Sequence, residues 1–167
     1  MKRAIIIIIL SGLLGCPSIE ESILLIETPG EIRKKAWEEA EQYIGMEYEW
    51  GGQDFYDRKG IDCSGLIVNC YRAAVTGTGY EVTFEDASVS DLLFSYTKQV
   101  DTPEIGDVIF MGEEDITHIA IFEKIEDNQV YFIDAYSVSG VVERRNYALD
   151  HHKIKRFGRI LVKKIYP

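Results

Sequence analysis

The 167-residue sequence contains few of the residues that crosslink small proteins or bind metals, with only three cysteines and three histidines. It has no CxxC and no HxxxH pair, and such close pairs are typical of zinc sites. Basic residues are also scarce relative to acidic ones, 18 against 28, which gives a formal net charge of −10. Since lysine and arginine bind phosphate backbones, this balance argues against a nucleic-acid partner. We expect neither a metal nor a cofactor.

Repeats and low-complexity segments are absent too. No period of about 20 to 50 residues recurs, which excludes solenoid and propeller architectures. With 46% hydrophobic residues, a chain of this length can bury one ordinary core. The sequence therefore predicts a single domain.

The apolar stretch at the N-terminus is too short to cross a bilayer comfortably. Lys2 and Arg3 precede twelve uncharged, mostly apolar residues at positions 4–15. A membrane-spanning helix needs roughly 20 apolar residues. A basic start followed by a short apolar run is typical of a secretory signal. We expect residues 1–15 to be a signal peptide, and the alternative is a buried strand or helix.

The sequence "LLGC" at positions 13–16 resembles the cleavage box of bacterial lipoproteins, in which the cysteine receives diacylglycerol and becomes the new N-terminus. The resemblance implies a lipid on Cys16, a tether over residues 16–30 and attachment to a membrane. Without residues 1–15 the chain keeps 16 basic and 28 acidic residues, a formal net charge of −12. Within the tether, the run "SILLIE" at 22–27 could form a strand or could pack under the domain.

Helical patterns come first in the remaining chain, and strand patterns follow. Apolar residues have helical spacing in three segments, 31–45, 62–74 and 87–96. Short β-branched and aromatic runs separated by polar turns then predict an antiparallel meander, and these runs are 106–111, 117–125, 129–136, 140–146 and 159–165. This order predicts an α+β fold with N-terminal helices packed on an antiparallel sheet of five to six strands.

Two cysteines lie seven residues apart in the second predicted helix, Cys63 and Cys70. Their Cα atoms would be about 10 Å apart at the helical rise. That separation exceeds the limit of about 7 Å for a disulfide and is too large for one shared zinc ion. Cys70, at an apolar helical position, is expected to be a small buried side chain.

Cys63 falls in the first turn of its helix, where free N–H groups and the helix dipole favour an anion and therefore a thiolate. Ser64 and Gly65 keep the approach to the sulfur small. Asp62 is a good N-cap residue, and alternatively it could face a substrate amine. The position of Cys63 makes it the candidate nucleophile.

A thiolate nucleophile needs a base, and the three histidines are the first candidates. His151 and His152 lie in a polar stretch and are expected at the surface. His118 lies in the predicted strand "THIAIF", where it would share a face with Ala120 and Phe122. Such a histidine is either a core residue whose ring nitrogens are hydrogen-bonded within the protein, or the base for Cys63.

The next predicted strand contains Asp134 as its only carboxylate among apolar neighbours. Burial of a carboxylate costs several kcal/mol unless it is paired. Its partner could be Arg144 or Arg145, or it could be the ring of His118. In the second case the carboxylate would hold the tautomer of the ring and favour the imidazolium.

Four motifs in this order resemble the NlpC family of bacterial cell-wall cysteine peptidases, over roughly residues 31–165. They are Tyr48-Glu49-Trp50-Gly51-Gly52, Asp62-Cys63-Ser64-Gly65-Leu66, Gly106-Asp107 followed by His118-Ile119-Ala120-Ile121, and a polar residue on the next strand, Asp134. The resemblance implies a circularly rearranged papain-like fold and a peptidase domain over residues 31–167. The third family residue is most often histidine, and the insert between Gly52 and Ile61 is longer than usual.

The resemblance also implies the roles of the site residues. Cys63 would be the nucleophile, His118 the general base and Asp134 the orienting residue. The Cys63 N–H and the Tyr48 hydroxyl would bind the oxyanion, with Asp62 and Ser64 beside the substrate. Trp50 would pack rather than react, and Gly51 and Gly52 would let the backbone turn tightly.

The implied reaction is cleavage of murein stem peptides at the γ-D-glutamyl to diamino-acid bond through an acyl-enzyme. The acidic surface would suit a substrate with free amines, although a solvated acidic face explains the same charge. Two other functions fit the sequence. One is a lipoprotein that binds wall peptides or a partner without turnover, and the other is a thiol amidase or acyltransferase. The sequence gives no oligomeric state, and a monomer is the default.

Overall fold

A computed structural model describes residues 24–52 and 60–165 of the chain. The described residues form three helices, which are α1 (Gly30–Gln42), α2 (Cys63–Val75) and α3 (Val89–Ser95). They also form eight strands, which are β1 (Leu25–Glu27), β2 (Tyr80–Glu81), β3 (Thr97–Val100), β4 (Val108–Met111), β5 (His118–Glu126), β6 (Gln129–Tyr136), β7 (Val141–Ala148) and β8 (Ile154–Lys164). The predicted signal peptide and the predicted lipid site, Cys16, lie outside the described residues.

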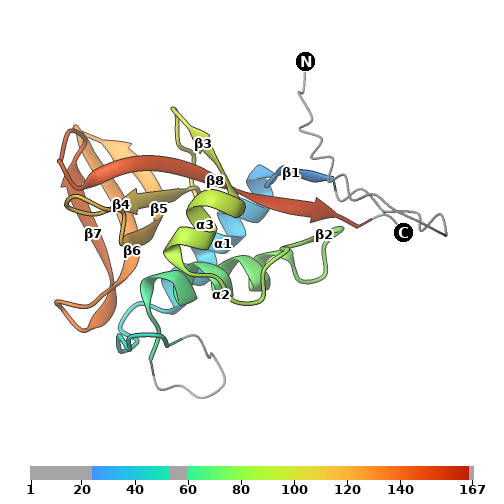
Figure 1. The fold of residues 1–167 in the computed structure, drawn as a ribbon, viewed down its shortest axis with the longest axis horizontal. Helices are drawn as coiled ribbons and strands as arrows, with labels where there is room; N and C mark the ends of the chain where they lie inside the picture. Colours follow the sequence, from blue (N-terminus) through green and yellow to red (C-terminus); the bar gives the residue numbers. More distant parts are fainter. Residues whose placement is uncertain (1–23, 53–59, 166–167) are drawn as a thin grey trace, which may run out of the picture.

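The strands form one antiparallel sheet in the order β1-β8-β4-β5-β6-β7, and β2 and β3 also pair with β8 (Figure 1). The predicted meander is present from β4 to β7. The last strand, β8, does not continue it. Instead β8 returns beside β4 and then extends past the meander to pair with β1 at Leu161–Lys163. The predicted α+β class is confirmed, and the sheet is larger than expected because three short strands line β8.

The three helices match the three predicted segments to within a few residues. In α1 the side chains of Ile32, Ala36 and Ala40 recur at helical spacing and are all buried. Helix α3 has a capping box in which Ser88 and Asp91 bond each other's backbone N–H groups. Local capping and apolar spacing therefore explain why these helices could be predicted from sequence.

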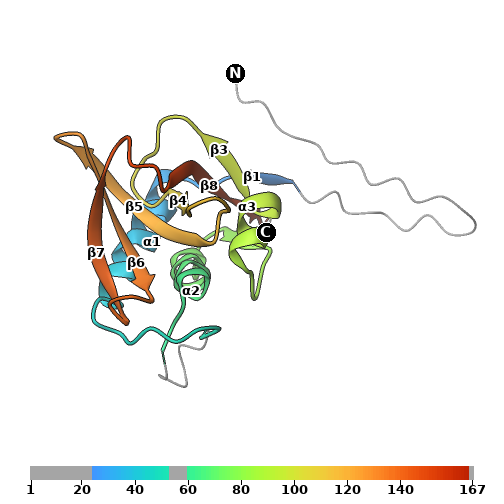
Figure 2. The same cartoon turned by 60° about the vertical axis from the view of Figure 1, so that its left-hand side comes forward.

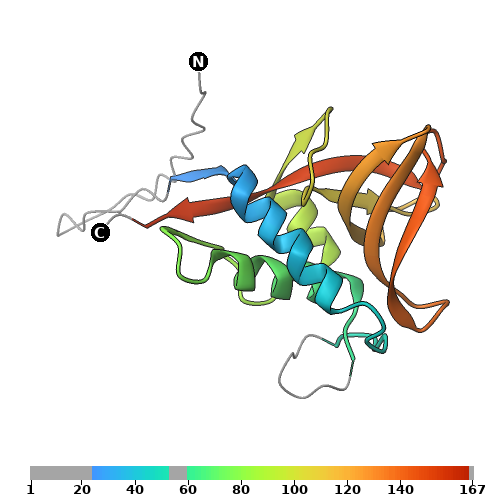
Figure 3. The same cartoon turned by 180° about the vertical axis from the view of Figure 1, so that it is seen from behind.

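Apolar side chains alternate along the strands and fill cores on both faces of the sheet. In β4, Val108 and Phe110 pack in the core under the helices, whereas Ile109 and Met111 pack in a second core on the opposite face. Helix α2 is seen end-on next to β5 and β6 (Figure 2). Helix α1 crosses α2 when the molecule is viewed from behind (Figure 3). The side chains on the second face are therefore directed away from these helices.

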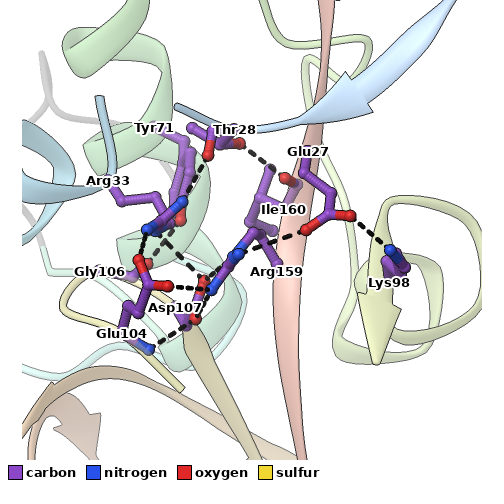
Figure 4. Close-up of polar contacts among 10 residues, drawn as sticks. All are labelled: Glu27, Thr28, Arg33, Tyr71, Lys98, Glu104, Gly106, Asp107, Arg159 and Ile160. Carbon is purple, nitrogen blue, oxygen red and sulfur yellow. Dashed lines mark hydrogen bonds and ion pairs between the residues drawn. The ribbon is translucent and has the colours of Figure 1, made fainter. Parts of the chain in front are cut away.

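A cluster of buried charges ties α1 to β4 and β8 (Figure 4). Asp107 is fully buried and accepts two hydrogen bonds of 2.8 Å from the Arg159 guanidinium. The buried guanidinium of Arg33 bonds the Thr28 carbonyl at 2.6 Å and pairs with Glu104. Gly106 has φ +82°, and a Cβ there would lie 2.0 Å from the Arg33 carbonyl. The Gly106-Asp107 motif therefore has a structural role in this chain.

The segment "SILLIE" contributes Leu25–Glu27 to the sheet as β1, which answers the question that the sequence left open. Ile26 lies opposite Val162 and packs against the core under the helices. Within residues 24–52 and 60–165, no helix combines the length and the apolar character that a bilayer crossing requires.

Candidate active site

Cys63 is the first residue of α2, and Asp62 is the N-cap, as its sequence position predicted. The Asp62 carboxylate accepts hydrogen bonds from Gly65 N at 2.7 Å, from Ser64 Oγ at 2.9 Å and from Gly51 N at 3.1 Å. The carboxylate thus caps α2 and, through Gly51 N, also binds the loop that precedes the helix. These bonds position Cys63, which is only 8% exposed, at the positive end of the helix dipole.

The loop Tyr48–Gly52 packs directly on the start of α2. Asp62 N donates to Gly52 O at 2.9 Å. A Cβ at Gly65 would lie 2.5 Å from the same carbonyl oxygen, and Gly51 has φ +72°. A larger side chain at either glycine would strain the loop or displace it from Cys63.

The strand registers bring His118, Asp134 and Arg145 together on one face of the sheet. Ile121 in β5 lies opposite Ile133 in β6, and Phe132 lies opposite Arg145 in β7. In these registers Asp134 has His118 as a diagonal neighbour on one side and Arg145 on the other. All three side chains lie on the face of the second core, opposite the helices.

Asp134 pairs with Arg145 and with His118, two of the three partners that the sequence offered, whereas Arg144 pairs with Glu41 and Glu123. Its Oδ2 lies 2.5 Å from His118 Nε2, and its Oδ1 accepts a 3.0 Å bond from Arg145 Nε. The Asp134 side chain is fully buried, and Arg145 Nη2 adds a second bond to it. The two-pronged contact with a guanidinium compensates a buried carboxylate and fixes its orientation toward His118.

Cys63 lies close enough to His118 to affect the pKa of its ring, as Asp134 does. Burial of the ring tends to lower the pKa of His118, but the hydrogen bonds and charges of Asp134 and Cys63 outweigh it and raise this pKa from 6.5 to about 9. Because Asp134 is bonded to Nε2, Nδ1 is the ring nitrogen left for the thiol. The fold therefore brings together the candidate nucleophile Cys63 and the candidate base His118, which are 55 positions apart in the sequence.

Tyr48 and Ser64 lie beside the cysteine. Burial raises the pKa of Tyr48, and the nearby Cys63 and Asp62 raise it further, so its hydroxyl stays protonated and can donate. Ser64 is buried and its hydroxyl is bonded to Asp62. Tyr48, Asp62 and Ser64 therefore all lie near Cys63, around the same cavity.

A cavity of about 590 Å³ opens above Cys63, between the Tyr48–Gly52 loop and the segment that starts α3. Its volume is within the usual range for ligand sites, about 300–1,000 Å³. Trp50 lines this cavity and is 87% exposed. The expectation that Trp50 packs in the protein was wrong, since the loop turns at Gly51 and leaves the indole at the cavity rim.

The other cysteine and histidines have the environments predicted for them, with one difference. Cys70 is fully buried, and burial raises the pKa of its thiol. His152 is exposed, as predicted, and pairs with Glu113. His151 differs from the prediction because it is half-buried and stacks on Tyr147, with 4.1 Å between the ring centres. Among residues 24–52 and 60–165, no group of three or more His, Cys, Asp or Glu side chains is placed to hold a metal ion.

Arg145 was predicted only as an alternative partner of Asp134, and Lys153 was not predicted to belong to the site. Arg145 completes the site by stacking on Tyr136, with its Cζ 3.4 Å from the ring centre. Lys153 lies near His118 on the wall of a smaller cavity. The register of β6 on β7 would identify Arg145, but Lys153 comes from a loop whose path the sequence pattern does not encode.

Comparisons with known proteins identify the family and the fold. The sequence model of the NlpC/P60 family matches residues 45–156. A comparison with curated proteins gives no match.

Three solved structures share the fold. One is a Staphylococcus aureus protein similar to lipoprotein, of the NLP/P60 family, with 23% identity and a TM-score of 0.57 over 86% of this chain and 44% of that one. Another is NlpC1 from Trichomonas vaginalis, with 19% identity and a TM-score of 0.57 over 80% of this chain and 46% of that one. This chain therefore spans less than half of those two proteins.

RipD from Mycobacterium tuberculosis, described as a non-catalytic NlpC/p60 domain protein adapted to peptidoglycan binding, has 17% identity and a TM-score of 0.53 over 78% of this chain and 98% of that one. Similarity at these identities concerns the fold. The family match covers more than half of the chain and includes Cys63, His118 and Asp134. The chain belongs to the NlpC/P60 family.

Proposed function

We propose that this protein is a cell-wall cysteine endopeptidase that cleaves murein stem peptides at the γ-D-glutamyl to diamino-acid bond. Family membership supports a cell-wall peptidase or wall-binding role. One observation carries the finer proposal. His118 contacts the Cys63 thiol and is bonded at 2.5 Å to the buried Asp134, which is the arrangement that thiol catalysis requires.

The reaction begins when the Cys63 sulfur, with its proton transferred to His118, attacks the scissile carbonyl carbon. A C–S bond forms, and the carbonyl oxygen becomes an oxyanion. The Cys63 N–H at the start of α2 and the Tyr48 hydroxyl are the donors for this oxyanion. Asp134 stabilises the imidazolium that forms in this step and keeps its Nδ1 directed at the sulfur.

The oxyanion then collapses, and the C–N bond breaks. His118 gives its proton to the departing amine, which leaves a thioester on Cys63. A water molecule that loses a proton to His118 attacks the thioester carbonyl carbon, the C–S bond breaks, the acid product leaves, and His118 returns the proton to the sulfur. The raised pKa of His118, about 9, keeps the ring protonated near neutral pH, which suits its role as the acid toward the amine.

The large cavity supports a substrate that carries free amines. Asp62, Asp86 and Asp91 line it, and Trp50 offers an exposed aromatic face at its rim. Carboxylates and an indole both attract ammonium groups. A stem peptide whose N-terminal alanine is free carries such a group.

The N-terminal sequence supports a location outside the cytoplasm. We propose that residues 1–15 are removed and that a lipid on Cys16 holds the domain at a membrane. β1 begins at Leu25, so a short segment would join the lipid to the sheet. Intact-mass analysis of the protein from membranes, beside a Cys16→Ala variant, tests the lipid. An unmodified Cys16 in the mature protein would contradict it.

Digestion of purified murein tests the reaction. Wild-type protein should release fragments whose masses place the cut after γ-D-glutamate, and Cys63→Ala should lower the rate at least about 10³-fold. Cys70→Ala is the matched control, because Cys70 is a buried thiol in the same helix. If Cys63→Ala released the same fragments at the same rate, Cys63 would not be the nucleophile.

The second candidate is a wall-binding protein without turnover, the property described for RipD. Iodoacetamide near neutral pH separates the two functions. An active enzyme should be alkylated at Cys63 much faster than at Cys70, and His118→Ala should slow the Cys63 reaction. Equal and slow labelling of both thiols would favour binding without catalysis. Release of an amine other than the diamino acid would instead indicate an amidase.

A further inference from the structure

A second and smaller cavity, of about 140 Å³, lies beside His118 at the open end of the second core. Its walls include Thr117, His118, Tyr136, Arg145, Tyr147 and Lys153. Thr117 also lines the large cavity, so the two spaces adjoin at the start of β5. A water molecule takes about 30 Å³ in the liquid. The small cavity therefore has room for a carboxylate and the atoms next to it.

The two cavities differ in charge. The large one is lined by Asp62, Asp86 and Asp91, and no lysine or arginine is among its described lining residues. The small one has Arg145 and Lys153 with a single acidic residue, Glu113. A peptide lying across Cys63 and His118 would thus meet negative charge at one end and positive charge at the other.

Lys153 is the cation best placed to bind a ligand. Arg145 is committed to Asp134 through two hydrogen bonds. The Lys153 ammonium lies 2.8 Å from Glu113 Oε1 in an ion pair whose side chains are 35% and 65% exposed. An ammonium has three donors, so this contact leaves two of them. Tyr147 accepts a 3.3 Å bond from Arg145 Nη1, which leaves its own hydroxyl proton available to donate.

The proposed function decides which half of the substrate enters this cavity. His118 must give a proton to the departing nitrogen, so the departing residue lies against the imidazole. The imidazole is also a wall of the small cavity. An α-carboxylate on the departing residue is only two bonds away from that nitrogen.

We propose that the small cavity binds a free carboxylate of the departing residue, with Lys153 as its main cation. Glu113 pairs with Lys153 when no ligand is bound, and the substrate carboxylate competes with it. The inference rests on the proposed function and makes it more specific. The preferred substrates are stem peptides that end at the diamino acid, because a longer stem has an amide in place of this carboxylate.

Calorimetry with the Cys63→Ala protein tests binding without turnover. The probes are L-Ala-γ-D-Glu-L-Lys and the same peptide with a C-terminal carboxamide. The acid should bind about tenfold more tightly than the amide, because it alone forms a charge-assisted contact with Lys153. In Cys63→Ala with Lys153→Gln this preference should fall below about twofold, and Glu113→Gln should increase it.

Lys124→Gln is the matched control. Lys124 is an exposed lysine of β5 that pairs with Glu126 and does not line either cavity. Its substitution should leave the preference for the acid unchanged. This control separates a local contact from a general effect of net charge on an acidic protein.

The outcomes separate this inference from the proposed function. Equal affinities for acid and amide, no measurable binding of the acid, or a preference that survives Lys153→Gln would each overturn the carboxylate site. Turnover is measured with the wild-type protein. If it cleaves neither peptide while the Lys153-dependent preference is present, the carboxylate site stands and the proposed reaction fails. If it cleaves both with equal kcat/KM and binding shows no preference, the reaction stands and the site fails.

Discussion

The Asp134 carboxylate lies between two cationic partners, with Oδ2 at 2.5 Å from His118 Nε2 and Oδ1 at 3.0 Å from Arg145 Nε. A buried charge that orients an imidazole is thereby neutralised from the opposite side by a guanidinium. His118, Asp134 and Arg145 lie on the face of the sheet that carries the second core, so Asp134 contributes both to stability and to the candidate active site.

The charge of Asp134 is expected to control the protonation of His118. Asp134→Asn keeps the size and one hydrogen bond but removes the charge, so the pKa of His118 should fall from about 9 toward its usual 6.5. The alkaline limb of the pH profile of kcat/KM should therefore shift to lower pH. We also expect the rate near neutral pH to fall about 10²-fold. An unchanged limb would show that Asp134 does not set the protonation of His118.

Arg145 is expected to matter for stability more than its partial exposure suggests. Arg145→Met leaves Asp134 buried with only His118 as a partner, and removing one member of a buried ion pair costs about 3 kcal/mol of unfolding free energy. Urea denaturation measures this loss. Arg144→Met is the control, since Arg144 pairs with Glu41 and Glu123 at the surface and its loss should cost about 0–1 kcal/mol. Equal losses in the two variants would contradict this role of Arg145.

The raised pKa of His118 predicts a dependence of stability on pH. Since the folded-state pKa of about 9 exceeds the usual 6.5, protonation stabilises the folded protein. This contribution is fully present below pH 6.5 and is lost as the pH rises through about 9. The difference in unfolding free energy between wild type and His118→Gln should therefore shrink from pH 6 to pH 9.5. A difference that is constant over this range would rule out the raised pKa.

Local signals in the sequence predicted most of the fold and part of the site. The Asp62 cap and the apolar spacing behind it located α2 and Cys63, because capping and helical packing depend on near neighbours. The strand pattern located His118 on the face of Ala120 and Phe122, and it located Asp134 on the next strand. The position of β8 between β1 and β4 could not be predicted, since nothing in residues 154–164 encodes which strand they pair with. The exposure of Trp50 was missed for a similar reason, because it follows from the turn at Gly51 and the packing of Gly52 on Gly65.

The buried charges around Asp107 offer a test that leaves the active site untouched. Asp107→Asn removes the buried charge that faces the Arg159 and Arg33 guanidinium groups and leaves the more exposed Glu104 as the acid that both contact. We expect a loss of about 3 kcal/mol in unfolding free energy. The rate of Cys63 alkylation should stay within about twofold of wild type at a temperature where the variant is folded. A large fall in alkylation would show that this cluster is coupled to the site.

Trp50 is expected to contribute to substrate binding and not to stability. Its side chain is 87% exposed at the rim of the large cavity, so Trp50→Ala should change the unfolding free energy by less than about 0.5 kcal/mol. Loss of an aromatic face near ammonium groups should raise KM several-fold with little change in kcat.

The chain has one other tryptophan, the half-buried Trp37. Fluorescence of Cys63→Ala should therefore change when a stem peptide binds, and this change should vanish in Trp50→Phe but persist in Trp37→Phe. A signal that followed Trp37 instead would place the peptide away from the cavity above Cys63.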